Sequence, residues 1–197
     1  MQLSDYKAIH KGEKCLVLGL GSSLNDIDEL PSGITTIGVN NIQQKFDTDY
    51  LITLDNIQKF DVERKQAIIN NKGILFTQLG EWNSVRNNVV EFSLGNYGGI
   101  NFEANLASDK LNYSYTSPFV ACVLAIYMGF DEIGMLGVDF TDNHFNKKDG
   151  KHSLVSRLNQ IDKHFAEINK YHKIYNLSNI SQLRSLERCE LSSFIRY

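Results

Sequence analysis

The feature that most constrains this sequence is a series of short, almost continuous apolar runs, each followed by small or polar residues. A run such as Lys14–Gly19 predicts a strand that is buried on both faces. Stretches compatible with helix separate the runs, and this alternation predicts an α/β fold, a mostly parallel sheet with helices on both faces. The predicted strands are Lys14–Gly19, Ile34–Val39, Tyr50–Leu54, Gly73–Thr77, Val89–Phe92, Ile133–Val138 and Lys173–Leu177.

Capping residues and helical periodicity predict the connecting helices. The clearest is Ser117–Gly129, an apolar segment with Pro118 in its first turn and a glycine at its end. Two polar or glycine-containing segments, Leu94–Asn105 and Thr141–Lys151, are predicted to be loops. The remaining predicted helices are Ser23–Leu30, Asn56–Asn71, His152–Tyr171 and Ser181–Arg188.

Length and composition favour a single domain over residues 1–197, since 42% of the residues are apolar and can form a substantial core. No run of eighteen apolar residues and no apolar leader occurs, so we expect no membrane span and a cytoplasmic location. Cys15, Cys122 and Cys189 form neither a disulfide framework nor a zinc pattern, and the histidines lack HExxH spacing. The chain is also compatible with a homo-oligomer.

The charge of the chain is uneven. The net charge is −3 and only six of the 20 basic residues are arginine, which disfavours a protein that binds nucleic acid non-specifically. Residues 141–197, however, carry ten basic and six acidic side chains. We therefore expect this later segment, with lysines at 147, 148 and 151, to face any anionic ligand.

Small and polar residues follow each predicted strand, at the edge where ligands bind in open parallel sheets. The turn after the first strand combines glycines and serines at a helix start, where free N–H groups can hold phosphate, although the full GxGxxG pattern is absent. The alternative is a purely structural turn. The residues at this edge are Gly19, Gly21, Ser22, Ser23, Asn40, Asp55, Thr116, Ser117 and Asp139.

Four of the polar positions offer more than one role. Thr116 either binds a phosphate or sugar or caps the following helix. Asp139 either accepts hydrogen bonds from a ribose or orients a catalytic partner, or it forms a turn with Thr141. His144 and His152 are candidate general bases near neutral pH, although each taken alone is typical of a surface histidine.

Four stretches carry a family resemblance: CLVLGLGSSLNDID, TTIGVNN, YLITLD and TSPFVACVLAIYMGFDEIGMLGVDF. They resemble the core of the small bacterial lipooligosaccharide sialyltransferases. They equally resemble the wider group around the 6-hydroxymethylpterin diphosphokinase-like and flagellin-modification accessory proteins. The resemblance implies a Rossmann-like, GT-A-related fold. For the sialyltransferase members it also implies a nucleotide-sugar donor, no essential metal and a histidine base.

The resemblance assigns roles to individual residues. It implies that Gly19, Gly21, Ser22 and Ser23 face the nucleotide phosphates and that Asn40 contacts the nucleotide. Asp55 stands where the sialyltransferases carry asparagine, so donor recognition is expected to differ there. Thr116 and Ser117 match the pair at the helix start, and Asp139 matches the aspartate of the G-[IV]-D-F string. His152 falls at the position of the catalytic histidine, with His144 as the reserve.

We therefore expect a metal-independent glycosyltransferase that moves a sugar from a nucleotide-sugar to a hydroxyl of a glycan or small molecule, without a required cofactor. One alternative is a Mg²⁺-dependent diphosphotransferase acting on a pterin-like alcohol, with Asp139 and Asp55 as metal ligands. Another is a nucleotide-binding module without catalysis. A nucleic-acid acceptor stays a minor alternative, because the basic later segment permits it while the negative net charge and scarce arginine disfavour it.

Overall fold

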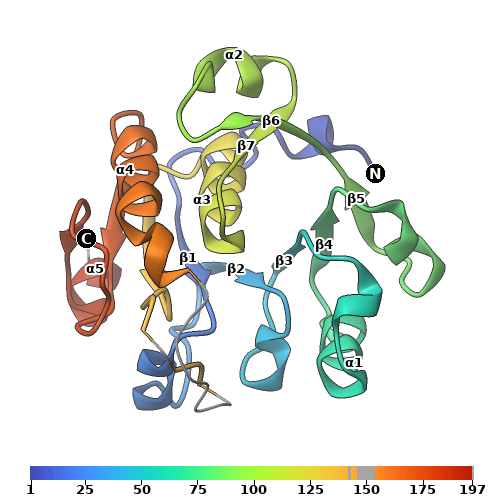
Figure 1. Ribbon diagram of the computed structural model, residues 1–197, viewed down its shortest axis with the longest axis horizontal. Helices are drawn as coiled ribbons and strands as arrows, with labels where there is room; N and C mark the ends of the chain where they lie inside the picture. Colours follow the sequence, from blue (N-terminus) through green and yellow to red (C-terminus); the bar gives the residue numbers. More distant parts are fainter. Residues whose placement is uncertain (142, 146–153, 197) are drawn as a thin grey trace.

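The computed structural model describes residues 1–141, 143–145 and 154–196, and these fold around one large parallel sheet (Figure 1). The strand order in the described chain is β10-β9-β8-β1-β2-β3-β4-β5, and every neighbouring pair is parallel. This confirms the predicted α/β fold. The strands are β1 (Lys14–Leu18), β2 (Thr35–Val39), β3 (Tyr50–Thr53), β4 (Ile74–Thr77), β5 (Val89–Glu91), β8 (Glu132–Leu136), β9 (Lys173–Asn176) and β10 (Glu187–Arg188).

The central strands are apolar throughout because both of their faces are buried. In β1, Cys15 and Val17 pack into the core on the side of α3 (Ser117–Met128) and α4 (Leu158–Ile168). Leu16 and Leu18 pack into a second core on the opposite face. Successive side chains of a strand point to opposite faces, so a strand covered on both sides loses the apolar–polar alternation of a half-exposed one.

The face opposite α3 is covered by shorter elements. Among them are α1 (Val62–Asn70), below the sheet in Figure 1, and α5 (Leu191–Arg196), at its left end. They contribute Ile68 and Phe194 to the second core. The 3₁₀ helices of the described chain are η1 (Leu3–Tyr6), η2 (Ser22–Asp26), η3 (Ile42–Gln44), η4 (Ile57–Lys59), η5 (Gly80–Ser84) and η6 (Val155–Arg157).

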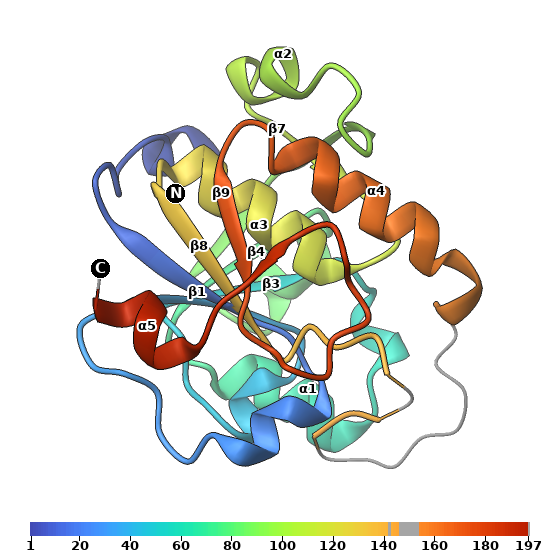
Figure 2. The same ribbon diagram turned by 90° about the vertical axis from the view of Figure 1, so that its left-hand side faces the viewer.

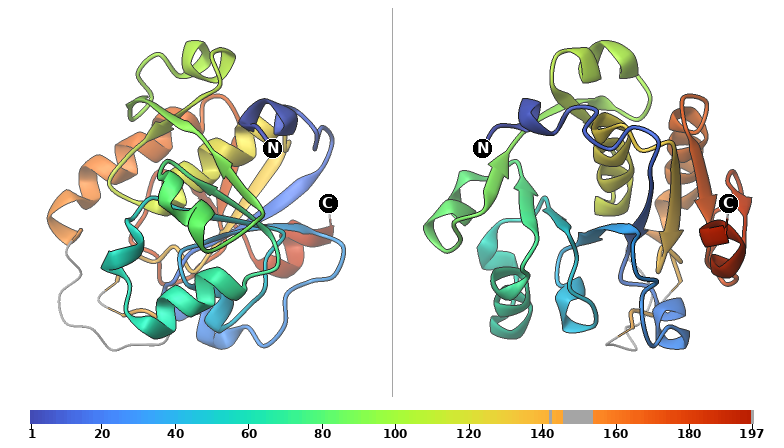
Figure 3. Two further views of the ribbon diagram at one scale, coloured as in Figure 1. Left: turned by 90° about the vertical axis from the view of Figure 1, so that its right-hand side faces the viewer. Right: turned by 180° about the vertical axis from the view of Figure 1, so that it is seen from behind.

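Helix α3 is buried on every side, which explains its lack of a polar face. All residues from Phe119 to Met128 are buried between the sheet and an excursion of the chain that lies above it (Figure 3). This excursion consists of β6 (Ser93–Tyr97), α2 (Phe102–Ala107) and β7 (Lys110–Tyr113), and its two strands pair in parallel. Gly129 ends α3 with a φ of +89°, as its position predicts.

Two predictions from the sequence were wrong. Leu94–Asn105 is not a loop, since β6 ends at Tyr97 and α2 begins at Phe102, with Asn101 in the left-handed conformation between them. Ser181–Arg188 is not a helix. The hydroxyls of Ser181 and Ser185 donate to the backbone carbonyls of Val138 and Asp162, and such bonds compete with helix formation.

Other predicted helices exist with different bounds. In place of the predicted helix Ser23–Leu30 the structure has the shorter 3₁₀ helix η2, which begins at Ser22 and ends at Asp26. The predicted helix Asn56–Asn71 is divided, and α1 begins at Val62 because the carboxylate of Asp61 caps it by accepting from the Arg64 N–H. Of the predicted helix His152–Tyr171, residues 152 and 153 lie outside the described residues, and α4 covers Leu158–Ile168.

Cys15 and Cys122 are buried as free thiols, and burial raises the pKa of both.

Within the described ranges, none of the helices combines the length and apolarity that crossing a bilayer requires.

Candidate functional site

The order of strands along the sheet reverses at β1. After β1 the chain builds outward through β2, β3, β4 and β5, and it later returns to place β8 on the other side of β1. Ligands in open parallel sheets bind outside the carboxyl ends of the strands at such a switch point. The site is therefore expected beyond Leu18 and Leu136, the last residues of β1 and β8.

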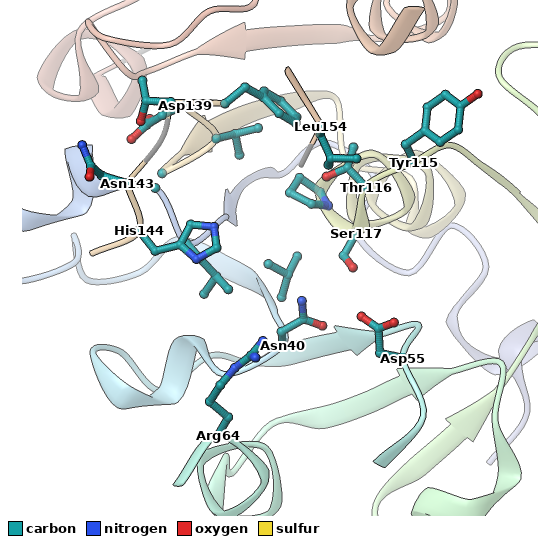
Figure 4. Close-up of a pocket in the computed structure, with 18 residues that line it drawn as sticks. Asn40, Asp55, Arg64, Tyr115, Thr116, Ser117, Asp139, Asn143, His144 and Leu154 are labelled. Atoms are coloured by element: carbon teal, nitrogen blue, oxygen red, sulfur yellow. The ribbon is translucent and has the colours of Figure 1, made fainter. Parts of the chain in front are cut away.

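A cavity of about 210 Å³, which we call the first cavity, opens at this place (Figure 4). It joins segments far apart in the sequence: the turn after β1, the ends of β2 and β3, the start of α3 and the segment after β8. Seven of the candidate site residues from the sequence analysis line it, namely Gly21, Asn40, Asp55, Thr116, Ser117, Asp139 and His144. Three others, Gly19, Ser22 and Ser23, lie beside it without being part of its lining.

One side of the cavity is held together by Asp139, whose side chain is buried. One carboxylate oxygen accepts from the N–H of Ser23 at 2.8 Å and the other accepts from its hydroxyl at 2.7 Å. Gly21 passes so close that a Cβ there would lie 2.3 Å from the Asp139 carboxylate. Asp139 thus fixes the turn after β1 through Ser23, and Gly21 provides the space for that contact.

The glycines of this turn also form backbone hydrogen bonds to the end of β8 and the residue after it. The N–H of Gly19 donates to the carbonyl of Leu136 at 2.8 Å, and that of Gly21 donates to the carbonyl of Gly137 at 2.7 Å. A Cβ at Gly19 would lie 2.2 Å from the latter oxygen. The N–H groups of Gly19, Gly21 and Ser23 are therefore already bonded within the protein, which favours the structural interpretation of this turn.

The ends of β2 and β3 form a second side, where Asn40 and Asp55 lie near Arg64 in Figure 4. Asn40 has a φ of +49°, and its side-chain oxygen accepts from the Thr53 hydroxyl at 3.1 Å. Asp55 pairs with Lys59 at 2.9 Å.

Arg64 is a lining residue that the sequence analysis did not identify. It lies on α1, its Nε donates to the side-chain oxygen of Asn41 at 3.1 Å, and its guanidinium lies 4.9 Å from the ring centre of Phe60. These contacts hold a cation at the cavity. Its only sequence signal is the rarity of arginine, because residues 1–140 contain just Arg64 and Arg86.

The start of α3 forms the third side of the cavity, with Thr116 at its N-cap position and Pro118 in its first turn. Thr116 is 8% exposed, and its hydroxyl makes no capping bond within the described helix. Tyr115 also lines the cavity beneath the guanidinium of Arg157, which lies 4.1 Å from the ring centre. The neighbouring Tyr97 phenol has the largest effect and lowers the pKa of Tyr115. Desolvation opposes this shift, and the Arg157 charge adds to it.

The segment after β8 brings the candidate base to the cavity. His144 pairs with Gly21 in an isolated antiparallel bridge, and the next N–H, of Phe145, donates to the carbonyl of Leu20 at 2.9 Å. Thr141 lines the same cavity, and its buried hydroxyl has no hydrogen-bond partner among the described residues. His152 and the lysines at 147, 148 and 151 lie outside the described residues.

Comparison with known proteins supports the fold. No family model matches the chain, and no curated protein matches it. Solved structures do match. The sialyltransferase CstII from Campylobacter jejuni, in complex with the substrate analogue cytidine-5'-monophosphate, is 17% identical with a TM-score of 0.54, over 90% of this chain and 85% of that chain.

Two further structures give the same result. The sialyltransferase CST-II in complex with a trisaccharide acceptor and CMP is 18% identical, with a TM-score of 0.58 over 89% of this chain and 85% of that chain. An α-2,3-sialyltransferase from Campylobacter jejuni in apo form is 16% identical, with a TM-score of 0.55 over 91% of this chain and 80% of that chain. The chain therefore has a sialyltransferase-like, Rossmann-like fold.

Proposed function

We propose that this protein is a glycosyltransferase that uses a nucleotide-activated sugar, and that the first cavity is its donor site. The observation that carries the proposal is the first cavity itself, which unites a cation, hydroxyls, an amide and a histidine at the switch point of the sheet. The fold is similar to that of sialyltransferases described in complex with CMP. A CMP-linked sugar is therefore the first donor to test.

In the proposed reaction, the acceptor hydroxyl oxygen forms a bond to the anomeric carbon while the bond from that carbon to the phosphate oxygen breaks. The nucleotide leaves with the bonding electron pair, and a histidine takes the acceptor proton as general base. Arg64 is positioned to stabilise charge on the departing phosphate, and Thr116 and Ser117 are positioned to donate to phosphate or sugar oxygens. The reaction needs no metal in this form.

The base is proposed to be a histidine of the segment 144–152. His144 lines the cavity, with its backbone bridged to Gly21. His152 is proposed on the family resemblance alone. The two are distinguished by the substitutions His144→Gln and His152→Gln.

The donor set of the first cavity disfavours the Mg²⁺-dependent diphosphotransferase alternative. Both carboxylate oxygens of Asp139 already accept from Ser23, and Asp55 is paired with Lys59. In the described ranges, no cluster of three or more His, Cys, Asp or Glu side chains is arranged to hold a metal. Measuring transfer in the presence and absence of a chelator tests this alternative directly, since loss of activity on chelation would support it.

The proposal is tested by thermal stability with CMP, UMP, GMP and AMP, followed by transfer from the matching nucleotide-sugar. We expect one nucleotide to raise the melting temperature, because a ligand that binds only the native state stabilises it. The substitution that removes the base is expected to reduce turnover by roughly 10²–10⁴-fold while nucleotide binding is retained. If no nucleotide stabilises the protein, the first cavity is not a nucleotide site. Unchanged turnover in both histidine variants would exclude a base in this segment.

A further inference from the structure

On the side of α4, the first cavity is continued by a group of exposed polar side chains. The guanidinium of Arg157 lies 4.1 Å from the ring centre of Tyr115, and the Tyr115 hydroxyl donates to the side-chain oxygen of Gln160 at 3.2 Å. Tyr115 lines the first cavity, whereas Arg157 and Gln160 are exposed and lie outside its lining. We call these three residues the Tyr115 cluster.

The Tyr115 cluster lies apart from the cation proposed to meet the nucleotide phosphate. Figure 4 shows the ring of Tyr115 pointing away from Asn40 and Arg64, which lie across the cavity. A group that binds at Arg157 is therefore separate from the phosphate at Arg64 and still adjoins the first cavity. This is the place where a second substrate would meet a donor bound in that cavity.

The cluster is carried by elements that are packed firmly together. Figure 2 shows α4 running alongside α3, and the rings of Phe119 and Phe165, one from each helix, have their centres 5.4 Å apart. Tyr97 of the excursion packs edge-on against Tyr115, with the ring centres 5.2 Å apart. The position of Arg157 over the ring of Tyr115 is thus fixed by the packing of three elements, which favours a preformed site.

The positive charge of the cluster has no counter-ion among the described residues, where no carboxylate lies within ion-pair distance of Arg157. The two carboxylates of α4 are bonded elsewhere. Asp162 accepts from two backbone N–H groups between β9 and β10, and Glu167 accepts from the N–H of Gly99. Both carboxylates that line the first cavity are also bonded within the protein.

The chemistry of the cluster favours an anion. A guanidinium presents a planar set of N–H donors that matches the two oxygens of a carboxylate or phosphate. The amide nitrogen of Gln160 adds a donor beside it, because the amide oxygen already accepts from Tyr115. We propose that the Tyr115 cluster is an acceptor subsite, and that the acceptor is a sugar carrying a carboxylate or phosphate group. This inference rests on the glycosyl transfer proposed above.

The test is an NMR titration of the whole protein, with and without CMP, using D-galactose, D-galacturonate and D-galactose 6-phosphate. These sugars differ only at carbon 6, which carries a hydroxyl, a carboxylate or a phosphate, so they also distinguish the two kinds of anion. We expect an acidic sugar to shift the Nε–H signal of Arg157 and to bind about fivefold more tightly than galactose. Equal binding of all three sugars, or no shift at Arg157, overturns the proposal.

A set of arginine variants makes the test specific. Arg157→Gln is expected to abolish the preference for the acidic sugar, and Arg157→Lys to retain only part of it, because an ammonium lacks the planar fork. Arg184→Gln is the control, since Arg184 is also exposed but contacts α4 through its backbone N–H. If Arg157→Gln keeps the preference, or if Arg184→Gln loses it, the proposal fails.

CMP affinity separates this inference from the donor site. Arg157→Gln is expected to leave CMP affinity unchanged, whereas Arg64→Gln is expected to weaken it. If Arg157→Gln weakens CMP binding as much as Arg64→Gln does, Arg157 belongs to the donor site and the acceptor subsite is excluded. If no nucleotide binds but an acidic sugar still shifts Arg157, the donor site fails alone and the acidic-sugar site remains.

Discussion

Two sides of the first cavity carry similar polar residues but use them differently. On the β8 side, defined as the lining residues Gly21 and Asp139 with Ser23 beside them, the polar groups bond to one another and to the backbone. On the α1–α3 side, defined as Arg64, Thr116 and Ser117, side chains line the cavity around a cation and a helix start. A polar residue at a strand end can therefore build the wall of a site rather than contact its ligand.

Because of this difference, substitutions on the two sides are expected to change different quantities. Substitutions on the β8 side are expected to lower the free energy of unfolding and to leave nucleotide affinity largely unchanged. Substitutions on the α1–α3 side are expected to weaken nucleotide binding and to leave the free energy of unfolding largely unchanged.

The largest effect is expected for Asp139→Asn. The variant loses the charge that accepts two hydrogen bonds from Ser23, and bonds to charged groups contribute about 1.5–3 kcal/mol each. Because asparagine retains one acceptor oxygen, we expect the free energy of unfolding to fall by about 2–3 kcal/mol. Urea denaturation measures this change.

The control for Asp139→Asn is Ser23→Ala, alone and in combination. Because the two side chains bond directly, the double variant is expected to lose less stability than the sum of the two single losses. Unchanged stability together with a much weaker nucleotide affinity would instead place Asp139 on the ligand, as the sequence analysis first allowed.

A smaller effect is expected for Arg64→Gln, this time on binding. Loss of a charged hydrogen bond to phosphate is expected to weaken CMP binding about tenfold, with little change in melting temperature. Isothermal titration calorimetry measures the dissociation constant. Repeating it at higher salt is expected to narrow the gap between variant and parent, because salt screens a charge at an open cavity.

Arg86→Gln is the matched control for Arg64→Gln. Arg86 is 6% exposed and donates to the carbonyls of Ile68 and Gly73, and burial lowers its pKa to about 10. Its substitution removes both of these hydrogen bonds, although the Gly73 carbonyl still accepts from the side-chain amide of Asn88, so we expect a lower melting temperature and unchanged CMP affinity. Weaker binding in the Arg86 variant but not in the Arg64 variant would contradict the assignment of Arg64 to the ligand.

The same contrast explains how much the sequence could predict. The sheet was predictable because β1 and β8 are short apolar runs, and burial on both faces leaves that pattern whatever the neighbours are. The convergence of Asn40, Asp55 and Asp139 on one edge was also predictable, since parallel strands end at the same side of a sheet. Thr116 joins them from the start of α3, which follows β7 outside the large sheet.

The bonding of these residues was not predictable, because it depends on contacts across the fold. Ser23 has the sequence signature of a helix cap, but its hydroxyl reaches Asp139, 116 residues later. Arg64 lies on a predicted helix and becomes a cavity residue only because Asn41 holds it there. Likewise, Ser181 and Ser185 prevent the predicted helix through bonds to Val138 and Asp162 that no local pattern shows.

The smallest effect is expected for His164→Gln. His164 does not line the first cavity, but it contacts the segment that leads into α3 and so supports the α1–α3 side. This residue of α4 is buried, and its Nδ1 lies 2.8 Å from the Ser114 hydroxyl, two residues before Thr116. Burial lowers the pKa of His164, and Glu167 partly opposes this shift. As the pH is lowered below the ordinary value of 6.5, the unfolded chain therefore takes up the proton before the folded chain does. The free energy of unfolding consequently decreases as the pH is lowered. His164→Gln removes this contribution, so the decrease in stability below that pH is expected to be less steep.

His172 provides the comparison, because burial lowers its pKa too, against the opposing charge of Asp131, but it lies between α4 and β9 and not, like His164, against Ser114. His172→Gln is also expected to make the free energy of unfolding depend less on pH below 6.5. The two variants should differ in CMP binding, since protonation of His164 disturbs its contact with Ser114 and hence the start of α3. We therefore expect His164→Gln alone to change how the dissociation constant for CMP varies between neutral and mildly acidic pH. If His172→Gln changes it equally, the effect comes from global stability, and the α3 start is not coupled to His164.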